Sequence, residues 1–365
     1  MRTTLLVLAS LLPASLAHAE VTPLTLTAPT PYQVVQRSGY DPKQAHHNAP
    51  GGPQLGHADL VVTAAGPVPE GVTLEARTVL LDAAYGKPVD WTTLDAQAPR
   101  LRVPAGGWYR LELRHRRGNE TIAAGSVEPV GVGEVFLIAG QSYSTNTNDE
   151  PLKVTEPQSR VVAFNNRTNT WQIANDPQPA SDLSQRGSIW PPVGDALVPL
   201  LRCPVAFANA GYGGTSIAQW QPGTPLYTFL EQTGSKLGRF RAVTWQQGES
   251  DVILKTSLDQ YQTGLRTLRS ASAKTWGFEP TWLLAKSTLH PTVYDDKEHE
   301  GRIREALDQL SREPGFQPGP DTDHLGGENR GDANSARHFS PIGQRRAALL
   351  WTITLWTEIH RQSQK

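Results

Sequence analysis

Short, continuous apolar runs alternate with longer segments of helical period in the last two thirds of the chain. Runs of four or five apolar residues are typical of strands that are covered on both faces, and the helical segments between them supply the cover. Five such runs lie at residues 135–139, 161–164, 205–208, 242–245 and 282–285. The pattern predicts an α/β domain over residues 132–365, with a doubly wound, five-stranded parallel sheet between two helical layers.

Two helix starts are visible in the same region. Ser257 precedes an apolar stripe at helical spacing that runs from Leu258 to Leu268, which suits a serine N-cap. Near the C-terminus, Ser340 and Pro341 are of the residue types preferred at an N-cap and at the first helical position. We therefore expect one helix after residue 257 and a last helix after residue 340.

Residues 20–131 show a different pattern. Strand-length runs are broken by Pro, Gly and Asp, and residues 108–114 alternate large apolar with charged side chains, as a half-solvated antiparallel strand does. No segment keeps a helical period over ten residues. This half is predicted to be a β-sandwich domain in front of the α/β domain.

The first 19 residues have the pattern of a signal peptide. Arg2 supplies a positive start, residues 5–16 form a short apolar stretch, and Ala17 and Ala19 are small residues at the positions that a signal peptidase requires. The stretch is too short to cross a bilayer, and no later segment reaches the roughly 18 apolar residues of a membrane helix. We expect a secreted or periplasmic protein without membrane insertion.

Composition and charge exclude several classes of function. The formal net charge of −1 leaves no basic surface for nucleic acid. The single cysteine, Cys203, excludes an intrachain disulfide and is expected to be a buried thiol. No His or Cys cluster has metal-ligand spacing, and His46-His47 is expected in a solvated loop, so neither a metal nor another cofactor is predicted. The ten tryptophans hint weakly at sugar binding.

Candidate chemistry follows the apolar runs, because sites in open α/β sheets form beyond the carboxyl ends of the strands. Gly140-Gln141-Ser142 follows the first run and can project the serine hydroxyl at the sheet edge. Gly213 and Gly214 follow the third run, where paired glycines let backbone N–H groups approach a bound oxygen. A phosphate loop is the rival interpretation, but the segment has no Gly-Lys-Ser/Thr ending. An oxyanion-hole donor fits better.

Further polar residues follow the later runs. Gln247 follows the fourth run, and its carboxamide is a neutral donor for a developing oxyanion; such a donor lowers a barrier by about 2.7–4 kcal/mol. Glu249 is either a functional carboxylate or, as we expect for Asp251, a solvated loop residue. His338 stands directly before the last predicted helix and is favoured as the histidine of the site over His290, which follows the fifth run.

These four segments, in this order, resemble the SGNH-hydrolase superfamily, and more narrowly its sialate O-acetylesterase and acetylxylan-esterase-like branch. The matching blocks are Gly140-Gln141-Ser142, residues 213–216, residues 245–251 and His338-Phe339-Ser340. The resemblance covers about residues 132–356. It implies a three-layer, flavodoxin-like sandwich with a five-stranded parallel sheet, beside an accessory β-domain.

The resemblance also implies roles for individual residues. Ser142 is expected to be the nucleophile and His338 the general base, and the oxyanion hole is expected to comprise the Ser142 N–H, the Gly214 N–H and the Gln247 side chain. Tyr143 stands where the family usually has Asn. The residues expected to line the substrate pocket are Gln141, Tyr143, Gly213, Thr215 and Trp220.

The carboxylate that orients the histidine has two candidates. The family expects an Asp three residues before the histidine, but that position is Ser335, and Asp332 lies six residues before His338, as though a short insertion separated them. In the acetylxylan-esterase-like branch, the Glu of the Gln-Gly-Glu block can also orient the histidine, which points to Glu249. Either carboxylate, or both together, would fix the tautomer and stabilise the imidazolium. Two carboxylates further back are less suited, Asp321 and Asp323.

The predicted function is therefore that of a serine esterase that removes O-acetyl groups from a carbohydrate, either an acetylated polysaccharide or sialic acid, through an acyl-enzyme. A general SGNH esterase or lipase on small esters is a second hypothesis, and a non-catalytic carbohydrate-binding protein on an esterase scaffold is a third. Charged, Trp-containing loops at residues 187–190 and 219–220 favour a polar substrate over an acyl chain. The sequence leaves the oligomeric state open.

Overall fold

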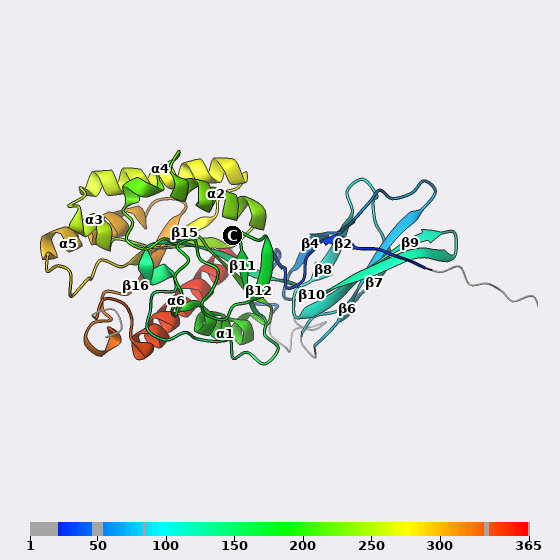
Figure 1. The fold of residues 1–365 in the computed structure, drawn as a ribbon, viewed down its shortest axis with the longest axis horizontal. Coiled ribbons are helices and arrows are strands. Elements are labelled where there is room, and N and C mark those ends of the chain that lie inside the picture. The colour runs from blue at the N-terminus through cyan, green and yellow to red at the C-terminus, as the bar shows by residue number, and fades with distance from the viewer. Residues whose placement is uncertain (1–20, 46–53, 83–84, 332–335, 364–365) are drawn as a thin grey trace, which may run out of the picture.

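The computed structural model describes residues 21–45, 54–82, 85–331 and 336–363. The predicted signal peptide, the pair His46-His47, Asp332 and Ser335 lie outside these ranges. Figure 1 shows an α/β body on one side and an elongated, strand-rich region on the other.

The α/β body is built on a sheet with the strand order β12-β11-β13-β10-β14-β15-β16. All neighbours from β11 to β16 pair in parallel, and β12 is antiparallel to β11. The strands are β10 (Glu120–Gly140), β11 (Val161–Asn165), β12 (Thr170–Ile173), β13 (Val205–Asn209), β14 (Ala242–Gln246), β15 (Thr281–Lys286) and β16 (Phe316–Asp321). All five predicted strands are present, but the prediction of five is wrong in number, because the sheet has a sixth parallel strand and an antiparallel edge strand.

The additional strands lie at the two edges of the sheet, where the sequence signal is weakest. β16 reads Phe-Gln-Pro-Gly-Pro-Asp and has no continuous apolar run. Proline lacks the N–H that a ladder needs, so it is tolerated on an edge strand and not in a central one. β12 alternates exposed with half-buried side chains, which is typical of an edge rather than of a strand covered on both faces.

Helices cover both faces of this sheet (Figure 1). One layer holds α1 (Trp190–Leu201) and α6 (Pro341–Gln362), which pack against each other. The other holds α2 (Pro225–Leu237), α3 (Glu249–Ile253), α4 (Leu258–Trp276) and α5 (Lys297–Leu310). Among the described residues, three short 3-10 turns complete the body: η1 (Ser142–Ser144), η2 (Ile217–Trp220) and η3 (Gly327–Asn329).

Both predicted helix starts are confirmed. The Ser257 hydroxyl accepts the N–H of Gln260 at 3.2 Å at the start of α4. The Ser340 hydroxyl accepts the N–H of Gly343 at 3.2 Å, and Pro341 opens α6. In each helix a side-chain oxygen thus satisfies one of the first N–H groups, which have no partner within the helix.

In the described part of residues 21–119, every regular element is a strand. β6, β7 and β9 continue the sheet from β10, while β2 pairs with β5 and β4 with β8. The strands are β1 (Thr22–Pro23), β2 (Leu26–Ala28), β3 (Val34–Gln36), β4 (His57–Val61), β5 (Thr63–Ala64), β6 (Thr73–Leu80), β7 (Val89–Thr93), β8 (Arg100–Pro104) and β9 (Trp108–Arg117).

A single strand, β10, joins the strand-rich region to the α/β body. Its first half pairs antiparallel with β9 from Glu120 to Gly131, and its second half pairs in parallel with β13 and β14 from Glu134 to Gly140. The domain boundary predicted between residues 131 and 132 therefore lies inside a continuous strand, with no linker at that point.

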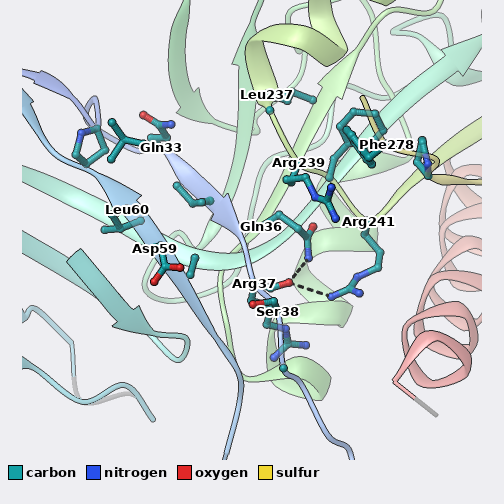
Figure 2. Close-up of a pocket in the computed structure, with 18 of the residues that line it drawn as sticks. Gln33, Gln36, Arg37, Ser38, Asp59, Leu60, Leu237, Arg239, Arg241 and Phe278 are labelled. Carbon is teal, nitrogen blue, oxygen red and sulfur yellow. Dashed lines mark hydrogen bonds between the residues drawn. The ribbon is translucent and has the colours of Figure 1, made fainter. Parts of the chain in front are cut away.

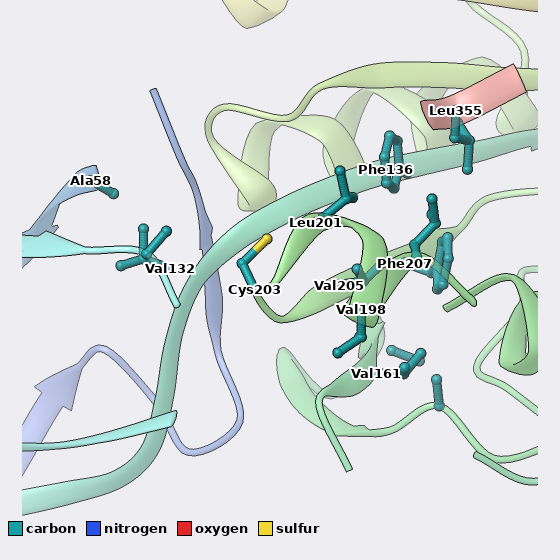
Figure 3. Packing of buried hydrophobic residues seen from close by; sticks show 14 of the residues in the cluster. Ala58, Val132, Phe136, Val161, Val198, Leu201, Cys203, Val205, Phe207 and Leu355 are labelled. Carbon is teal, nitrogen blue, oxygen red and sulfur yellow. The ribbon is translucent and has the colours of Figure 1, made fainter. Parts of the chain in front are cut away.

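The hydrophobic core is also continuous across this junction. Val132, Phe136 and Cys203 belong to one buried cluster, which extends to Ala58 in the strand-rich region (Figure 3). Cys203 is a buried free thiol, as predicted, and burial raises its pKa to about 11. In the part of the chain that the structure describes, no helix is long and apolar enough to cross a membrane.

A buried ionic network lies just beyond the junction. The Glu134 carboxylate accepts hydrogen bonds from Arg37 Nε at 2.8 Å, from Arg241 Nε at 2.7 Å and from Gln36 Nε2 at 2.9 Å. Burial alone would raise the pKa of Glu134, but the guanidinium groups of Arg241 and Arg37 hold it at about 2. The network connects β3, β10 and the segment before β14.

Candidate active site

The candidate residues gather at the edge formed by the carboxyl ends of β10, β13, β14 and β15. Gly140 ends β10 with φ +124°, and a Cβ built on it would lie 2.2 Å from the Gln246 carbonyl oxygen. Only glycine fits such a turn. Two residues later, Ser142 opens η1 with a half-buried side chain, and its carbonyl accepts the Thr145 N–H at 3.0 Å. The chain thus makes a sharp, fixed turn that presents Ser142 at the sheet edge.

The two glycines after β13 have different environments. The Gly213 N–H donates to Asp182 Oδ2 at 3.1 Å, and a Cβ built on Gly213 would lie 3.7 Å from the Ser142 Cβ. Gly214 is exposed with φ +71°, and within the described residues its N–H donates to no other group. Gly214 therefore remains the candidate donor to an oxyanion, while Gly213 lies against Ser142, the candidate nucleophile.

Asp182 is a residue of this site that sequence reasoning missed. Its second carboxylate oxygen accepts from the N–H of Ser184 at 3.0 Å and from the Ser184 hydroxyl at 2.7 Å, and that hydroxyl accepts the Asn146 N–H at 3.0 Å. Asp182 thereby connects the glycine loop to the segment after η1. It stands in an irregular loop without motif spacing, so the sequence offers no signal for it.

Gln247 does not have the geometry of an oxyanion donor, which corrects the prediction. Its side chain is fully buried, and its Nε2 donates to the Asp251 carboxylate at 2.6 Å, to the Thr215 carbonyl at 3.0 Å and to Gln141 Oε1 at 3.2 Å. Tyr261 donates to its Oε1 at 2.8 Å. An amide has two N–H groups, and both face protein acceptors. Gln247 therefore braces the loops beneath the site.

Asp251 is likewise part of this brace and is not the solvated loop residue that we expected. It is fully buried, and it accepts the Ile217 N–H at 2.8 Å and the Thr256 hydroxyl at 2.7 Å in addition to Gln247. Gln141, predicted to contact substrate, is only 3% exposed, and its Oε1 also accepts the Ser250 N–H at 3.2 Å. Both residues hold the loop after β14 in place.

Three further residues predicted to line the pocket are buried in the protein. Trp220 is fully buried against Trp245, with ring centroids 5.4 Å apart, and its Nε1 donates to the hydroxyl of the buried Thr215 at 3.0 Å. Tyr143 is 2% exposed, and its hydroxyl donates to the Arg337 carbonyl. Burial of a large aromatic side chain contributes more free energy than burial of a small one. Trp220 and Tyr143 are accordingly buried in the core and do not line a substrate pocket.

Tyr143 brings the nucleophile turn and the histidine together. It follows Ser142 directly, and its ring centroid lies 5.2 Å from that of His338. Arg330 donates to its hydroxyl and lies 5.0 Å above its ring. Ser142 and His338, which are 196 positions apart in the sequence, are therefore carried by segments in direct contact.

His338 is 8% exposed and directly precedes Phe339, which forms an isolated bridge with Arg330 before α6. Burial lowers its pKa to about 3, helped by the nearby positive charges of Arg337, Arg330 and Arg186 and by His290, whose ring lies 6.4 Å away. The imidazole is therefore neutral at pH 7, which is the protonation state that a general base needs. His290 is also neutral, because burial lowers its pKa to about 4.

Glu249 lies in the same region but does not bond to His338. One carboxyl oxygen accepts the Ser287 hydroxyl at 3.2 Å, and the other is buried without a hydrogen-bond partner in the described part of the chain. Burial raises the pKa of Glu249 to about 8, so this group carries a proton at neutral pH. A neutral carboxyl stabilises an imidazolium less than a carboxylate does.

The other acidic residues near the histidine segment either bond to other groups or lie outside the residues that the structure describes. Asp323 accepts the N–H groups of Thr288 at 2.7 Å and Leu289 at 2.9 Å, and Asp321 forms an ion pair with Arg304 at 2.5 Å. Asp332, the second candidate for orienting His338, lies outside the described residues. Among the residues that the structure describes, no three His, Cys, Asp or Glu side chains gather as ligands for a metal ion.

Part of the α/β body matches a known protein family. Residues 132–278 match the model of a family described as "Carbohydrate esterase, sialic acid-specific acetylesterase". The chain resembles these carbohydrate esterases. The resemblance predicted from the four sequence blocks, to SGNH hydrolases and their carbohydrate-esterase branch, is thus confirmed. A search of curated proteins finds no match.

Solved structures support the same fold. A carbohydrate acetylesterase from Xanthomonas citri superposes with a TM-score of 0.56 at 15% identity, over 89% of this chain and 72% of its own. A protein from Arabidopsis thaliana has a TM-score of 0.50 at 16% identity, over 61% of this chain and 97% of its own. At these identities the likeness concerns the fold, and the chemistry must be argued from the site.

Proposed function

We propose that this protein is a serine esterase that removes O-acetyl groups from a carbohydrate through a covalent acyl-enzyme. The observation that carries the proposal is the contact between the two halves of the site. The Ser142 turn and a neutral, buried His338 meet at one sheet edge, joined through the ring of Tyr143. A serine and a neutral imidazole at one edge are the pair that acyl transfer requires.

In the proposed reaction, His338 takes the proton of the Ser142 hydroxyl while the serine oxygen attacks the ester carbonyl. The negative oxygen that develops is stabilised by the N–H groups of Ser142 and Gly214, neither of which donates to another group among the described residues. When the intermediate collapses, the bond from the acetyl carbon to the sugar oxygen breaks, His338 gives its proton to that oxygen so that the sugar leaves as an alcohol, and the acetyl group stays on Ser142. Water, deprotonated by the same histidine, then releases acetate and restores the serine.

For the carboxylate that orients His338, we favour Asp332 over Glu249. The argument is one of charge. Glu249 is buried, bonds to Ser287 and is protonated below about pH 8. An acid six residues before the histidine is ionised at neutral pH unless it is deeply buried, and it would supply the negative charge that an imidazolium needs.

A carbohydrate ester is the proposed substrate class. The matched family is described as sialic acid-specific acetylesterase, and a structural relative is described as a carbohydrate acetylesterase. The pattern of residues 1–19 supports action outside the cytoplasm, secreted or periplasmic, where such polymers are found. Acetate release from acetylated xylan, acetylated pectin and O-acetylated sialic acid would identify the sugar. It would also distinguish a carbohydrate esterase from a general esterase or lipase, which would prefer small esters or esters with a lipid acyl chain.

The test of the proposed chemistry is the turnover of p-nitrophenyl acetate by the wild type, Ser142→Ala and Ser270→Ala. Ser270 is an exposed serine on α4 and serves as the matched control. We expect Ser142→Ala to lower kcat by at least about 1,000-fold, because residues of a nucleophile–base pair act as a unit, and Ser270→Ala to leave it unchanged. Equal rates for wild type and Ser142→Ala would contradict the esterase proposal and favour a non-catalytic carbohydrate-binding protein.

A further inference from the structure

A cavity of about 760 Å³ lies away from the candidate active site. One wall is formed by β3 and β4, and the other by residues 237–241, residues 278–281 and the end of α6 (Figure 2). Residues 241 and 280 precede β14 and β15, whereas Ser142 follows the end of the parallel strand β10. The cleft therefore lies at the amino ends of the parallel strands, opposite the carboxyl ends where Ser142 lies. Its volume is within the range of small-molecule and cofactor sites.

The lining of the cleft is rich in arginine. Against the arginines stand two acids, Asp59 and Glu279, and Glu279 already forms an ion pair with Arg269 at 2.7 Å. The arginines that line the cleft are Arg37, Arg100, Arg239, Arg241 and Arg361. A chain with a formal net charge of −1 thus concentrates positive charge in one place.

The floor of the cleft carries one positive charge in excess. Arg37 and Arg241 share a single carboxylate, that of Glu134. Arg37 is fully buried, and its Nη2 has no hydrogen-bond partner among the residues that the structure describes. In a buried setting, positive charge without a matching anion favours the approach of an anionic ligand, because water screens it poorly.

The rim offers free cations beside an aromatic ring. Arg239 is exposed, and its guanidinium lies 4.7 Å from the centroid of the Phe278 ring. Arg100, on the opposite wall, is also exposed. Among the described residues, neither Arg239 nor Arg100 forms an ion pair. Guanidinium groups bind carboxylates through paired hydrogen bonds, and the ring supplies an apolar surface next to them.

We propose that this cleft is a second binding site, which holds a segment of an acidic polysaccharide while an acetyl ester elsewhere on the polymer reaches Ser142. The sugar carboxylates pair with Arg239 and Arg100, and an apolar sugar face rests on Phe278. Hydroxyl groups find partners in the polar side chains of the same walls, Gln33, Ser38 and Asp59. The polymer part of this proposal rests on the proposed esterase function; the binding site itself does not.

The position of the cleft determines which substrates are affected by binding there. A sugar bound at one edge of the sheet does not present its own ester at the other edge. Binding there instead tethers the polymer and raises the effective concentration of its esters near Ser142. Turnover of small esters is therefore independent of the cleft, whereas the KM for long acidic chains depends on binding there.

Binding is tested on the full chain carrying Ser142→Ala, titrated calorimetrically with oligogalacturonide and with neutral xylo-oligosaccharide of equal length. We expect the acidic oligosaccharide to bind more tightly than the neutral one, and added salt to weaken it. Adding Arg239→Ala should weaken acidic binding by about 10-fold, the loss of one good charge-assisted contact. The matched control is Arg117→Ala, an exposed arginine at the end of β9, which should change nothing.

Activity separates failure of the cleft from failure of the esterase proposal. In the otherwise wild-type chain, Arg239→Ala should leave p-nitrophenyl acetate turnover unchanged and raise KM for acetylated pectin. The cleft proposal is overturned if the Ser142→Ala protein binds no oligogalacturonide, if it binds xylo-oligosaccharide equally well, or if Arg239→Ala behaves like Arg117→Ala. Oligogalacturonide binding that depends on Arg239, in a protein without p-nitrophenyl acetate turnover, supports the cleft and contradicts only the esterase.

Discussion

Asp182 connects the glycine loop with the nucleophile turn through hydrogen bonds that involve both of its carboxylate oxygens. The consequence for the proposed reaction concerns position rather than charge. The Gly213 peptide lies against Ser142, and the next N–H, that of Gly214, is the proposed oxyanion donor. An oxyanion donor acts only when it is fixed where the charge will develop.

We expect Asp182→Ala to lower kcat for p-nitrophenyl acetate by about 10–100-fold, because a shift of about 1 Å in a catalytic group has effects of this size. KM should change little. Asp182→Asn keeps one acceptor oxygen and should restore part of the rate. Steady-state kinetics of both variants, with urea unfolding as the control for stability, make the measurement. Loss of stability with an unchanged kcat would show that Asp182 is only structural.

The two candidate acids behave differently in rate measurements. Asp332→Asn should lower kcat by about 10²–10⁴-fold at pH 7, because the imidazolium loses its counter-charge and its fixed tautomer. Glu249→Gln should change kcat by only a few fold, since Glu249 already carries a proton below about pH 8. The reverse order of effects would transfer the orienting role to Glu249.

Glu249 also makes stability depend on pH. Its folded pKa of about 8 lies above that of an ordinary glutamate, about 4.3. Between these values the folded state binds one proton more than the unfolded state, so the free energy of unfolding falls with rising pH by up to about 1.4 kcal/mol per unit. The contribution is fully present below about pH 4.3 and is lost by about pH 8. Urea unfolding across this range should show the slope in wild type and a flatter curve in Glu249→Gln.

At the residue scale, sequence predicted which residues follow the strands but not which way they face. Ser142, Gly214 and His338 stand at the expected edge because the order of strand and loop is a local property. The burial of Gln247 and Trp220 depends on what packs around them, which a single sequence does not reveal. Asp182 contacts the distant Gly213 N–H directly and the Asn146 N–H only through Ser184, and no sequence pattern indicates such contacts.

Among the elements, α6 has the most direct link to the site. Its cap, Ser340, lies two residues after His338, and the Ser340 hydroxyl both accepts the Gly343 N–H and donates to the Glu328 carbonyl at 2.6 Å. The start of the helix and the histidine segment are therefore held by one side chain.

We expect Ser340→Ala to lower the free energy of unfolding by about 1–2 kcal/mol, the usual cost of losing an N-cap with a further buried hydrogen bond. Because His338 is so near, kcat should fall as well. Ser270→Ala again serves as the control. An unchanged unfolding curve would mean that the cap is dispensable.

The strands were predictable where they are buried on both faces, because such strands have a continuous apolar run in the sequence. β13 and β14 are buried throughout and were found. β16, with its two prolines, is a strand only because β15 lies beside it and supplies the pairing. Edge strands of this kind are determined by their neighbours, so local patterns do not indicate them.

At the scale of the whole molecule, the Glu134 network holds the two regions together. Glu134→Gln removes the carboxylate that two buried or partly buried guanidinium groups share. We expect the free energy of unfolding to fall by about 3–5 kcal/mol, as when one partner of a buried ion pair is removed. The matched control, Glu70→Gln, changes an exposed acid and should have no effect. Urea unfolding of both variants provides the comparison.

The hydrophobic pattern does change near the predicted boundary at residue 131, but this change does not mark the end of an element. The first half of β10 includes many exposed or half-buried positions, and the last eleven residues are all buried. The pattern changes because the surroundings of one strand change along its length. Sequence periodicity reports burial, and a change in burial need not coincide with the end of an element.

The continuity of β10 limits how this protein can be recombined. Modules joined by a linker can be exchanged by cutting the linker, but here a chimera must be spliced inside a hydrogen-bonded strand. One inserted residue would turn every following side chain to the opposite face of the sheet. Two would restore the faces and displace the nucleophile turn by about 7 Å along the strand. Any exchange of the strand-rich region must therefore preserve the number of residues between its sheet and Ser142.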